Sequence, residues 1–388
     1  MNNTTQNRSN YCEDSYEAYD AISYSEAALL QLRVTKCCFM NAAFVVKNRL
    51  SNTLSQFPVV LMAYVALPLI LFGLLANLLS VKIWSHAAMR QAPINWYLAV
   101  LSSSDFVILL FSFLVFTVPR VGQTAAVYAL VALSYAASPY AYALMLTAQT
   151  VSVYMTVLVS VHRFIGVCVP FKAGSLLTRG RVRLAIIVLL LFSVLFNASR
   201  LFEIRAASHC YYANIQYSLP QLQMSALRRH PVYVLLFHGW MNTIIMFAVP
   251  FTVLIVVNTM VISAVHRTTQ RHLSVCGEDD KHKRQEMAKE ISTSVMLIGI
   301  VVVFLSCNSL SFILNILENC DVHTNSTFGP TFSRLVEVSN LLTLVNASSN
   351  IFVYMLFSEK YRRLLKQNLF GCCCKRHDDV LLPLSMHS

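Results

Sequence analysis

The stretch that decides the fold reads AQTVSVYMTVLVSVHRFIGVCVPFKA and occupies residues 148–173. Its first Lys, Arg, Asp or Glu is Arg163, and the charge-free run that ends there begins as far back as residue 121. A helix needs roughly 20 apolar residues to cross the hydrocarbon core of a bilayer, so this run exceeds one membrane span. We therefore predict a transmembrane helix that ends near Arg163, preceded by an apolar extracellular connection at residues 121–135.

The same pattern recurs along the whole chain of 388 residues. When only Asp, Glu, Lys and Arg are marked, seven apolar stretches remain, and Asp105 is the sole charged residue inside any of them. The shortest stretch can still cross a bilayer, because Arg183 and Arg200 extend outward from its two ends. We therefore predict an all-α fold, a seven-transmembrane helix bundle. The stretches are residues 50–81, 91–119, 121–162, 184–199, 230–266, 291–317 and 338–358.

The composition argues against several classes of protein. Hydrophobic residues make up 56% of the chain and charged residues 12%, about half the charged share of an average soluble protein. A soluble enzyme could not bury so much apolar surface, so we expect no enzymatic activity. The net charge of +12 is distributed between the apolar stretches rather than on one basic face, so we expect membrane lipid and not nucleic acid as a partner.

The basic residues also predict the orientation. With the N-terminus outside, the three inner loops hold 13 Lys and Arg and the outer loops hold six. This is the positive-inside pattern, so we predict a multi-pass plasma-membrane protein with an extracellular N-terminus. Glycosylation sequons in the outer segments agree with this orientation and begin at Asn2, Asn3, Asn7 and Asn325.

The segment after the last apolar stretch, residues 358–371, reads SEKYRRLLKQNLFG. Its leucines alternate with basic residues at helical spacing, which predicts a short amphipathic helix on the cytoplasmic membrane surface. The cysteines that follow at 372–374 indicate palmitoylation rather than a zinc site, because zinc needs spaced cysteine pairs and further ligands. We therefore divide the chain into an extracellular tail (1–56), a seven-transmembrane domain (57–357), the surface helix (358–371) and a cytoplasmic tail (372–388).

Polar residues inside the apolar stretches mark the interior of the predicted bundle, since a polar group that faces lipid is costly. Around Asp105 two interpretations are open: a structural hydrogen-bonded cluster, or a hydrated pocket that binds a cation or a proton and changes between states. We favour the second, because acids within membrane spans are rare and usually functional. The other polar residues of this kind are Asn77, Gln149, Ser152, Asn346 and Asn350.

Four stretches together carry a family pattern in their order and spacing. They are the opening stretch, FSVLFNASRLFE (192–203), FAVPFTVLIVVN (247–258) and SNLLTLVNASSNIFVYMLFSEKYRRLL (339–365). From about Leu54 to Phe370 the chain resembles rhodopsin-like G-protein-coupled receptors and, within that class, invertebrate FMRFamide-type neuropeptide receptors. The resemblance implies an extracellular neuropeptide as ligand, an amidated RFamide-type peptide, and a heterotrimeric G protein as partner.

The resemblance also implies roles for matching residues. One set matches an inner polar network in which a sodium ion favours the inactive state, so sodium near Asp105 is the one bound ion that we expect; carboxylate, hydroxyl and amide oxygens suit such a cation. That set is Asn77, Asp105, Ser152, Asn346 and Asn350. The residues that match G-protein-coupling and switch positions are Arg163, Phe171, Asn258 and Tyr354.

Some switch positions depart from the family pattern. The acid that usually precedes the third-helix arginine is His162, and a neutral imidazole cannot pair with Arg163 as a carboxylate does. We therefore hypothesise a weaker restraint on the inactive state and raised basal signalling. The sixth-helix C-W-x-P motif is replaced by NSLS at 308–311, and Ile351 takes the place of the seventh-helix proline.

The usual disulfide between the third helix and the second outer loop also has no obvious counterpart. Ser138 or a neighbour stands at the third-helix position, so Cys210 of the loop lacks its usual partner. Cys210 either stays free or pairs with another cysteine, and the sequence does not choose among them. The alternatives are Cys12, Cys37, Cys38 and Cys320.

The ligand side is predicted from residues at the outer ends of the spans. The guanidinium of an Arg-Phe-amide needs a carboxylate and its phenyl ring an aromatic pocket, so we predict Glu203 and Glu337 as partners of the arginine. The alternative is that these acids are solvated or pair with Arg205 and Arg334. The full predicted ligand-binding set is Arg120, Tyr142, Gln149, Glu203, His238, Trp240 and Glu337.

Other functions of a seven-helix protein are less consistent with the sequence. A retinal pigment needs a lysine in the seventh span, and residues 338–358 contain none. A transporter or channel would more often show inverted repeats, broken half-helices or a filter sequence. The strongest alternative keeps the fold and changes the ligand: a chemosensory receptor for a small or peptide environmental ligand.

Overall fold

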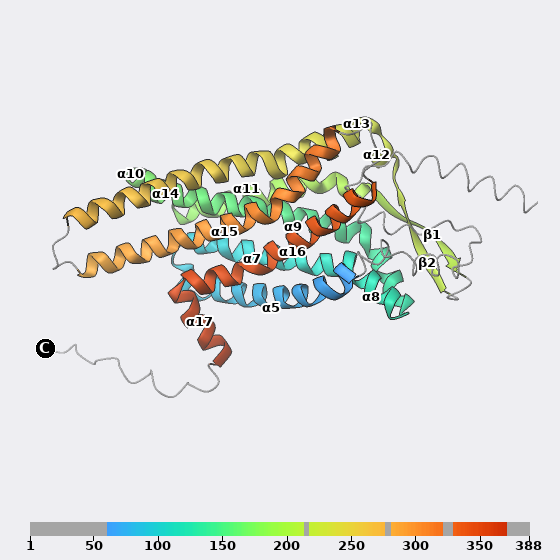
Figure 1. Cartoon of the computed structure of the whole chain (residues 1–388), viewed down its shortest axis with the longest axis horizontal. Helices are drawn as coiled ribbons and strands as arrows, with labels where there is room; N and C mark the ends of the chain where they lie inside the picture. The colour runs from blue at the N-terminus through green and yellow to red at the C-terminus, as the bar shows by residue number, and fades with distance from the viewer. Residues whose placement is uncertain (1–59, 213–216, 276–280, 321–328, 371–388) are drawn as a thin grey trace, which may run out of the picture.

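Seven helices are long and apolar enough to cross a membrane within residues 60–212, 217–275, 281–320 and 329–370, which the computed structural model describes. They lie side by side along the long axis of the molecule (Figure 1). The predicted seven-helix bundle is therefore confirmed. In chain order the spans are Val60–Trp84, Ile94–Thr124, Tyr128–Cys168, Arg179–Phe202, Pro231–Arg267, Ile291–Cys320 and Thr331–Phe357.

Several spans combine an α-helix with a short turn of different pitch. Several prolines stand near the start of a helix, although Pro139 lies inside the helix of the third span. Pro119, Pro170 and Pro231 occupy the first turn of α8, α10 and α13, where the missing N–H costs no hydrogen bond. The helices of the spans are η2 (Val60–Val65), α5 (Ala66–Trp84), α7 (Ile94–Ser112), η3 (Phe113–Thr117), α8 (Val118–Thr124), α9 (Tyr128–Cys168), α11 (Arg179–Asn197), η4 (Ala198–Phe202), α13 (Pro231–Tyr233), η5 (Val234–Met241), η6 (Ile244–Ala248), α14 (Val249–Val275), α15 (Lys281–Cys320) and α16 (Gly329–Phe357). The remaining helices are α6 (Ala87–Arg90), α10 (Pro170–Leu176), α12 (Ala226–Arg229) and α17 (Glu359–Phe370).

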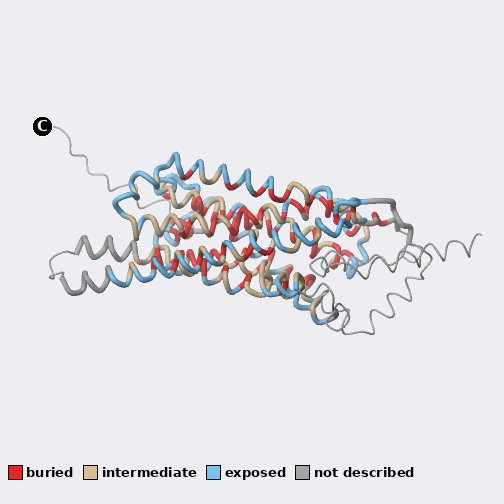
Figure 2. The backbone as a smooth tube through the Cα atoms, turned by 90° about the horizontal axis from the view of Figure 1, so that it is seen from above, coloured by how far each residue is buried: buried red, intermediate tan, exposed pale blue. Residues whose placement is uncertain are grey.

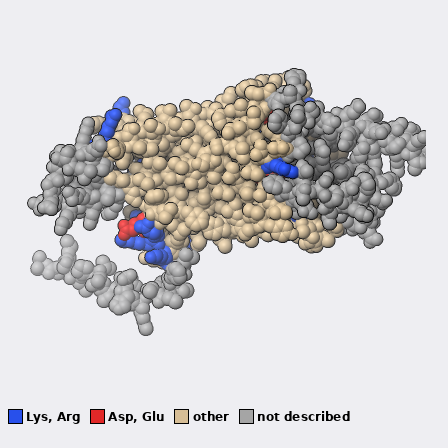
Figure 3. Space-filling model, in the orientation of Figure 1, with Lys and Arg blue, Asp and Glu red and all other residues tan. Residues whose placement is uncertain are grey.

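The surface of the bundle is suited to lipid. Buried residues lie on the sides of the helices that face one another, as Figure 2 shows. Side chains on the outer sides are large and apolar, with Leu75, Leu195 and Leu356 each at least 66% exposed. The visible middle of the molecule carries no Lys, Arg, Asp or Glu, and charges gather toward its two ends (Figure 3). In water this surface would be unfavourable, so the chain is a multi-pass membrane protein.

The two ends of the bundle differ in structure. At one end, which we call the hairpin end, β1 (Ile204–Tyr212) pairs antiparallel with β2 (Tyr217–Met224). The register pairs Ile204 with Met224, and a bulge lies between Ala206 and His209. This hairpin is an addition to the predicted all-helical architecture. At the other end, the α17 end, α17 turns away from the bundle axis and α14 and α15 extend beyond the other helices (Figure 1).

The connection predicted at residues 121–135 is shorter than expected. α8 continues to Thr124 and α9 begins at Tyr128, so most of this segment is helical. The run contains several alanines and leucines, which favour a helix. Ser134 Oγ donates to the carbonyl oxygen of Leu114 at 2.6 Å, which holds this part of α9 against the second span. At about 1.5 Å per residue, α9 is therefore much longer than the membrane core.

Candidate functional site

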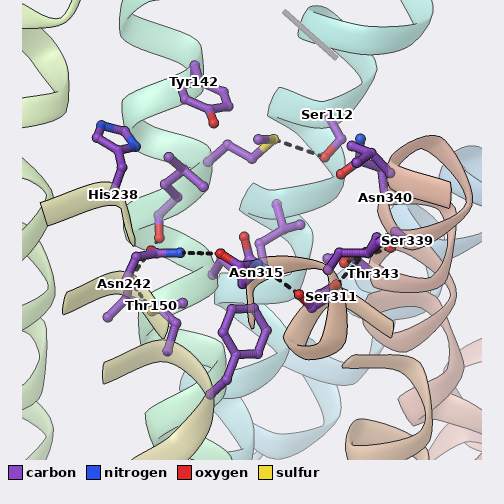
Figure 4. Close-up of a pocket in the computed structure, with 18 of the residues that line it drawn as sticks. Ser112, Tyr142, Thr150, His238, Asn242, Ser311, Asn315, Ser339, Asn340 and Thr343 are labelled. Atoms are coloured by element: carbon purple, nitrogen blue, oxygen red, sulfur yellow. Dashed lines mark hydrogen bonds between the residues drawn. The ribbon is translucent and has the colours of Figure 1, made fainter. Parts of the chain in front are cut away.

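A cavity of about 160 Å³ lies between the spans in the half of the bundle nearer the hairpin end. Its wall combines aromatic and aliphatic side chains with amides and hydroxyls, and Figure 4 shows the polar groups converging on it from facing helices. Among the residues that line it, Arg200, His238 and Glu318 are the titratable groups apart from Tyr142. Such a cavity can hold an apolar ring and several hydrogen-bonding groups of one ligand.

The structure brings three of the predicted ligand residues to this cavity. Tyr142 and Gln149 reach it from the third span and His238 from the fifth. Trp240 does not line it, because its side chain is 48% exposed on the outside of the fifth span. The remaining three predicted residues, Arg120, Glu203 and Glu337, lie outside its wall and are engaged in buried contacts described next.

Arg120 and Glu337 form a buried ion pair between the second and seventh spans. The Arg120 Nη2 lies 3.1 Å from Glu337 Oε1, and Arg120 Nη1 donates to the carbonyl oxygen of Phe116 at 2.9 Å. The two side chains are only 9% and 1% exposed. The pairing of Glu337 with Arg334 that the sequence left open is therefore replaced by a contact across the bundle, which aligns two helices.

Glu203 lies in a second buried network at the hairpin end of the fourth and fifth spans. Its Oε1 accepts from Tyr233 at 2.7 Å and from His238 Nε2 at 2.9 Å. Arg200 Nη1 lies 3.4 Å from His238 Nδ1, and because arginine can only donate, Nδ1 is the acceptor and Nε2 carries the proton. Burial alone would raise the pKa of Glu203, but the contact with His238, the charge of Arg200 and the Tyr233 bond outweigh it and lower that pKa to about 2. Glu203 is thus held as a carboxylate by its neighbours.

Arg200 connects this network to the cavity. It is 5% exposed, and its Nη2 donates to Asn242 Oδ1 at 3.0 Å. Asn242 in turn donates from Nδ2 to Asn315 Oδ1 of the sixth span at 3.3 Å. A continuous chain of polar contacts therefore runs from Glu203 through the cavity wall to α15.

The inner polar cluster around Asp105 forms as a compact unit in the middle of the bundle. Ser152 Oγ donates to Asp105 Oδ1 and Asn350 Nδ2 donates to Asp105 Oδ2, both at 2.7 Å. Asn77 Nδ2 donates to the carbonyl oxygen of Ala347 at 2.8 Å, one turn away on the seventh span. The described contact of Asn346 is through its carbonyl, which accepts from the Ser349 hydroxyl. The structure therefore joins three of the five predicted network residues directly through the Asp105 carboxylate.

The predicted coupling residues lie on four helices toward the α17 end. Arg163 is half-buried near the end of α9, whereas Phe171 on α10 is fully exposed. Asn258 Nδ2 donates to Ser160 Oγ at 3.1 Å, which joins the fifth span to the third. Tyr354 on α16 is fully buried.

Tyr354 belongs to a cluster of three rings that anchors α17. Trp84 and Tyr361 lie with their ring centroids 5.1 and 5.3 Å from that of Tyr354, and 5.2 Å from each other. Tyr361 is on α17, and its hydroxyl lies 2.8 Å from Ser80 Oγ on the first span. Burial raises the pKa of Tyr361 to about 12, so this hydroxyl stays protonated. α17 is therefore fixed to the first and seventh spans by an apolar contact with a polar end.

The comparison with protein families decides the class of this bundle. Residues 76–354 match the family model described as 7 transmembrane receptor (rhodopsin family). The chain belongs to the rhodopsin family of seven-transmembrane receptors. These proteins are receptors rather than enzymes, and the α17 segment lies just beyond the matched part of this receptor.

Three relatives indicate where the receptor falls within its family. It is 30% identical to the FMRFamide receptor of Drosophila melanogaster over 75% of this chain, although the match spans only half the length of that relative. It is also 30% identical to the FMRFamide peptide receptor frpr-18 of Caenorhabditis elegans, over 82% of this chain and 71% of the relative. The probable G-protein coupled receptor frpr-1 of the same nematode is 30% identical, over 83% and 82%. The predicted resemblance to FMRFamide-type receptors is thereby confirmed.

Sequence reasoning missed several residues that organise this receptor. Asn315 and Asn319 are amides in or beside an apolar stretch, the same signal that identified Asp105, and could have been found by it. Tyr361 stands on the apolar face of the amphipathic segment, but nothing in the sequence indicates its contact with Ser80.

The structure removes one of the possible disulfide partners of Cys210, because Cys320 is a free cysteine. The side chain of Cys210 lies outside the described part of the chain, and so do Cys12, Cys37 and Cys38.

Proposed function

We propose that the receptor binds an extracellular neuropeptide of the RFamide type and signals through a heterotrimeric G protein. The observation that supports this most strongly is its likeness to FMRFamide receptors of two animal phyla over most of the chain. The cavity is compatible with such a ligand, since it offers apolar surface for a phenyl ring and amides for a peptide end. The chemosensory alternative has less support, because no such ligand appears in the names of these relatives.

We assign the carboxylate that receives the peptide's guanidinium to Glu318. Glu203 and Glu337, the acids predicted from the sequence, do not line the cavity. Glu318 is half-buried at the hairpin end of α15 and is the one Asp or Glu among the described cavity-lining residues. An arginine and a carboxylate that meet in a partly desolvated site form a strong charge-assisted hydrogen bond.

A cycle of receptor and peptide variants tests this assignment. We expect Glu318→Gln to raise the half-maximal concentration of an Arg-Phe-amide peptide by about ten- to a hundredfold. The control is a peptide with citrulline, a neutral isostere, in place of that arginine: it should be weaker on the native receptor and nearly unaffected by Glu318→Gln. Equal shifts for both peptides would show that Glu318 does not contact the guanidinium.

The orientation that we propose places the hairpin end outside the cell and the α17 end in the cytoplasm. Four basic residues of α17 are exposed, and they suit the anionic inner surface of a plasma membrane; they are Lys360, Arg362, Arg363 and Lys366. The exposed ring of Phe171 and the long ends of α14 and α15 are then available to a Gα subunit. Glycosylation and palmitoylation remain expectations, because the sequons at 2–7 and 325 and the cysteines at 372–374 lie outside the described residues.

We also propose a sodium ion beside Asp105. Oxygen donors suit this ion, and Asn350 Oδ1, next to the carboxylate, is a buried acceptor without a hydrogen-bond partner in the described part of the chain. Asp105, Ser152 and Asn350 would hold the ion. Bound there, a cation would offset the charge of the buried carboxylate and favour the arrangement in which these spans are close together.

A further inference from the structure

The sixth span is an uninterrupted helix. α15 runs for 40 residues, from Lys281 to Cys320, and contains no proline. Sharp kinks in helices nearly always occur at proline, at Gly/Ser pairs or at π-bulges, and the NSLS segment at 308–311 continues as regular α-helix. α15 is therefore one continuous helix, so a displacement of its hairpin end can be carried to its α17 end.

A ridge of polar residues holds the hairpin half of this helix to its neighbours. Ser311, Asn315 and Asn319 are spaced four residues apart, so they lie along one ridge of the helix. Ser311 Oγ lies 2.5 Å from Ser339 Oγ on the seventh span. Asn315 Oδ1 accepts from Asn242 Nδ2 at 3.3 Å, and Asn319 Nδ2 donates to Oγ1 of Thr243 on the fifth span at 2.9 Å.

A glycine on the fifth span leaves room for this ridge. A Cβ atom on Gly239 would come within 2.6 Å of Asn319 Oδ1, so the absence of a side chain at Gly239 is what lets Asn319 reach the fifth span. Toward the α17 end, α15 packs mainly through buried apolar side chains such as Met296, Leu297 and Phe304, together with the bond from Ser292 Oγ to the carbonyl oxygen of Phe357.

The same polar ridge faces the cavity. Ser311 and Asn315 line it together with their partners Asn242 and Ser339, and Figure 4 shows the four side chains around one space. A ligand that reaches this depth meets the groups that hold α15 in place. The amide and carbonyl groups of the ligand can form hydrogen bonds in place of those between the helices. The ligand would then bind more tightly when α15 has moved away from its neighbours than when it is held against them, and such a difference in affinity is what shifts the population between two states.

We propose that the Asn242–Asn315 hydrogen bond is the latch of the sixth helix: it holds α15 in the inactive position, and ligand binding in the cavity releases it. This inference rests on the proposed receptor function and adds the residues that couple the cavity to the helix. Asn315 acts as a positioning residue for signalling, and its partner Asn242 does so from the fifth span. Ser311 and Asn319, the other two residues of the ridge, help to hold α15 in the same position through their own hydrogen bonds.

The test measures basal signalling without any peptide, per receptor at the cell surface. Breaking one side-chain hydrogen bond between membrane helices should raise basal activity by roughly three- to twentyfold. We expect this for both Asn315→Ala and Asn242→Ala, although Asn242→Ala also removes the acceptor of Arg200. The double variant should show no rise beyond that of Asn242→Ala, because the bond between the two residues is already absent in it. Ser306→Ala, at an exposed position on the same helix, is the control and should leave basal activity unchanged.

If the cavity left by alanine at either position prevents surface expression, variants of nearly the same shape as asparagine can test the latch instead. Asn242→Asp removes the donor of the latch and should raise basal activity, whereas Asn315→Asp keeps the acceptor and should not. A lower peptide potency with unchanged basal activity in the alanine variants would make Asn315 a ligand contact only and would overturn the latch. A loss of surface expression with native activity per receptor would show a purely structural role and would overturn it as well.

A second readout separates failure of this inference from failure of the proposed function. A thiol reagent should label Ser294→Cys, a position buried toward the α17 end, faster when Asn315→Ala is also present, in purified receptor without any G protein. If no Gα reporter responds to any RF-amide peptide but the labelling rate rises, the proposed function fails and the latch stands. If peptides activate the native receptor while labelling and basal activity are unchanged by Asn315→Ala, the latch alone is wrong.

Discussion

His162 stands beside Arg163 where a carboxylate would pair with the guanidinium, and we predict that it weakens the restraint on the inactive state. His162 packs edge-on against Tyr97, with ring centroids 5.8 Å apart, and its Nε2 is buried with no hydrogen-bond partner in the described structure. A carboxylate at this position could pair with the neighbouring guanidinium, and a hydrogen bond between charged groups contributes about 1.5–3 kcal/mol.

We therefore predict that His162→Glu lowers basal signalling by about tenfold or more. The measurement is basal second messenger at matched surface expression. His162→Gln, which is polar but uncharged, is the control and should stay near the native level. If the glutamate variant signals as strongly as the native receptor without ligand, the histidine does not weaken the restraint.

Some site residues could be predicted from the sequence because their chemistry is unusual for their surroundings. Asp105 was found because a carboxylate inside an apolar stretch is rare, and Ser152 and Asn350 do contact it. The acids at the rim were harder to interpret. Glu203 and Glu337 look like exposed charges in the sequence, and only the fold shows that His238 and Arg120 have already engaged them. Pairings between residues more than 200 positions apart, such as Arg120 with Glu337, follow from helix order and rotation, which composition does not encode.

At the scale of elements, the Arg120–Glu337 pair holds the second span against the seventh. Both side chains are buried, so removing one partner takes this ion pair from a charge that stays in a low-dielectric environment, at a cost of about 3–5 kcal/mol. We predict that Arg120→Met or Glu337→Met alone markedly lowers the Tm of the receptor in detergent. The double variant should recover most of that loss, because neither charge of this pair remains. A double variant as unstable as either single one would mean that each residue has a separate role.

The lengths of the elements were only partly predictable. The cores of the seven spans follow directly from the positions of charged residues, since lipid tolerates few of them. The extension of α9 back to Tyr128 was missed because the rule of about 20 residues per span describes the membrane and not the helix. β1 and β2 were missed because a hairpin between two spans carries little hydrophobic pattern, and its register depends on tertiary contacts with the third span.

At the scale of the whole molecule, three layers of side-chain contacts lie one below another along the bundle axis. The cavity and its amide ridge are nearest the hairpin end, the Asp105 cluster occupies the middle, and the Trp84–Tyr354–Tyr361 rings are near the α17 end. The seventh span contributes to all three, through Ser339, Asn350 and Tyr354. A change of helix position at the cavity would therefore alter the environment of the middle layer, and an ion bound there would act on the ligand site in return.

This reciprocity gives a prediction for the intact receptor. If sodium binds beside Asp105 only when the spans are close together, it stabilises that state by RT ln(1 + [Na⁺]/Kd), which is about 1.4 kcal/mol at ten times Kd. We predict that the purified receptor has a higher Tm in sodium chloride than in potassium chloride of the same ionic strength, and that sodium lowers its affinity for an activating peptide. Asp105→Asn should remove both differences between the salts, whatever it does to the Tm itself. Equal behaviour of the native receptor in the two salts, or a difference that survives in Asp105→Asn, would place the ion elsewhere or exclude it, and the Asp105 cluster would then be a hydrogen-bonded structural element that moves with the seventh span.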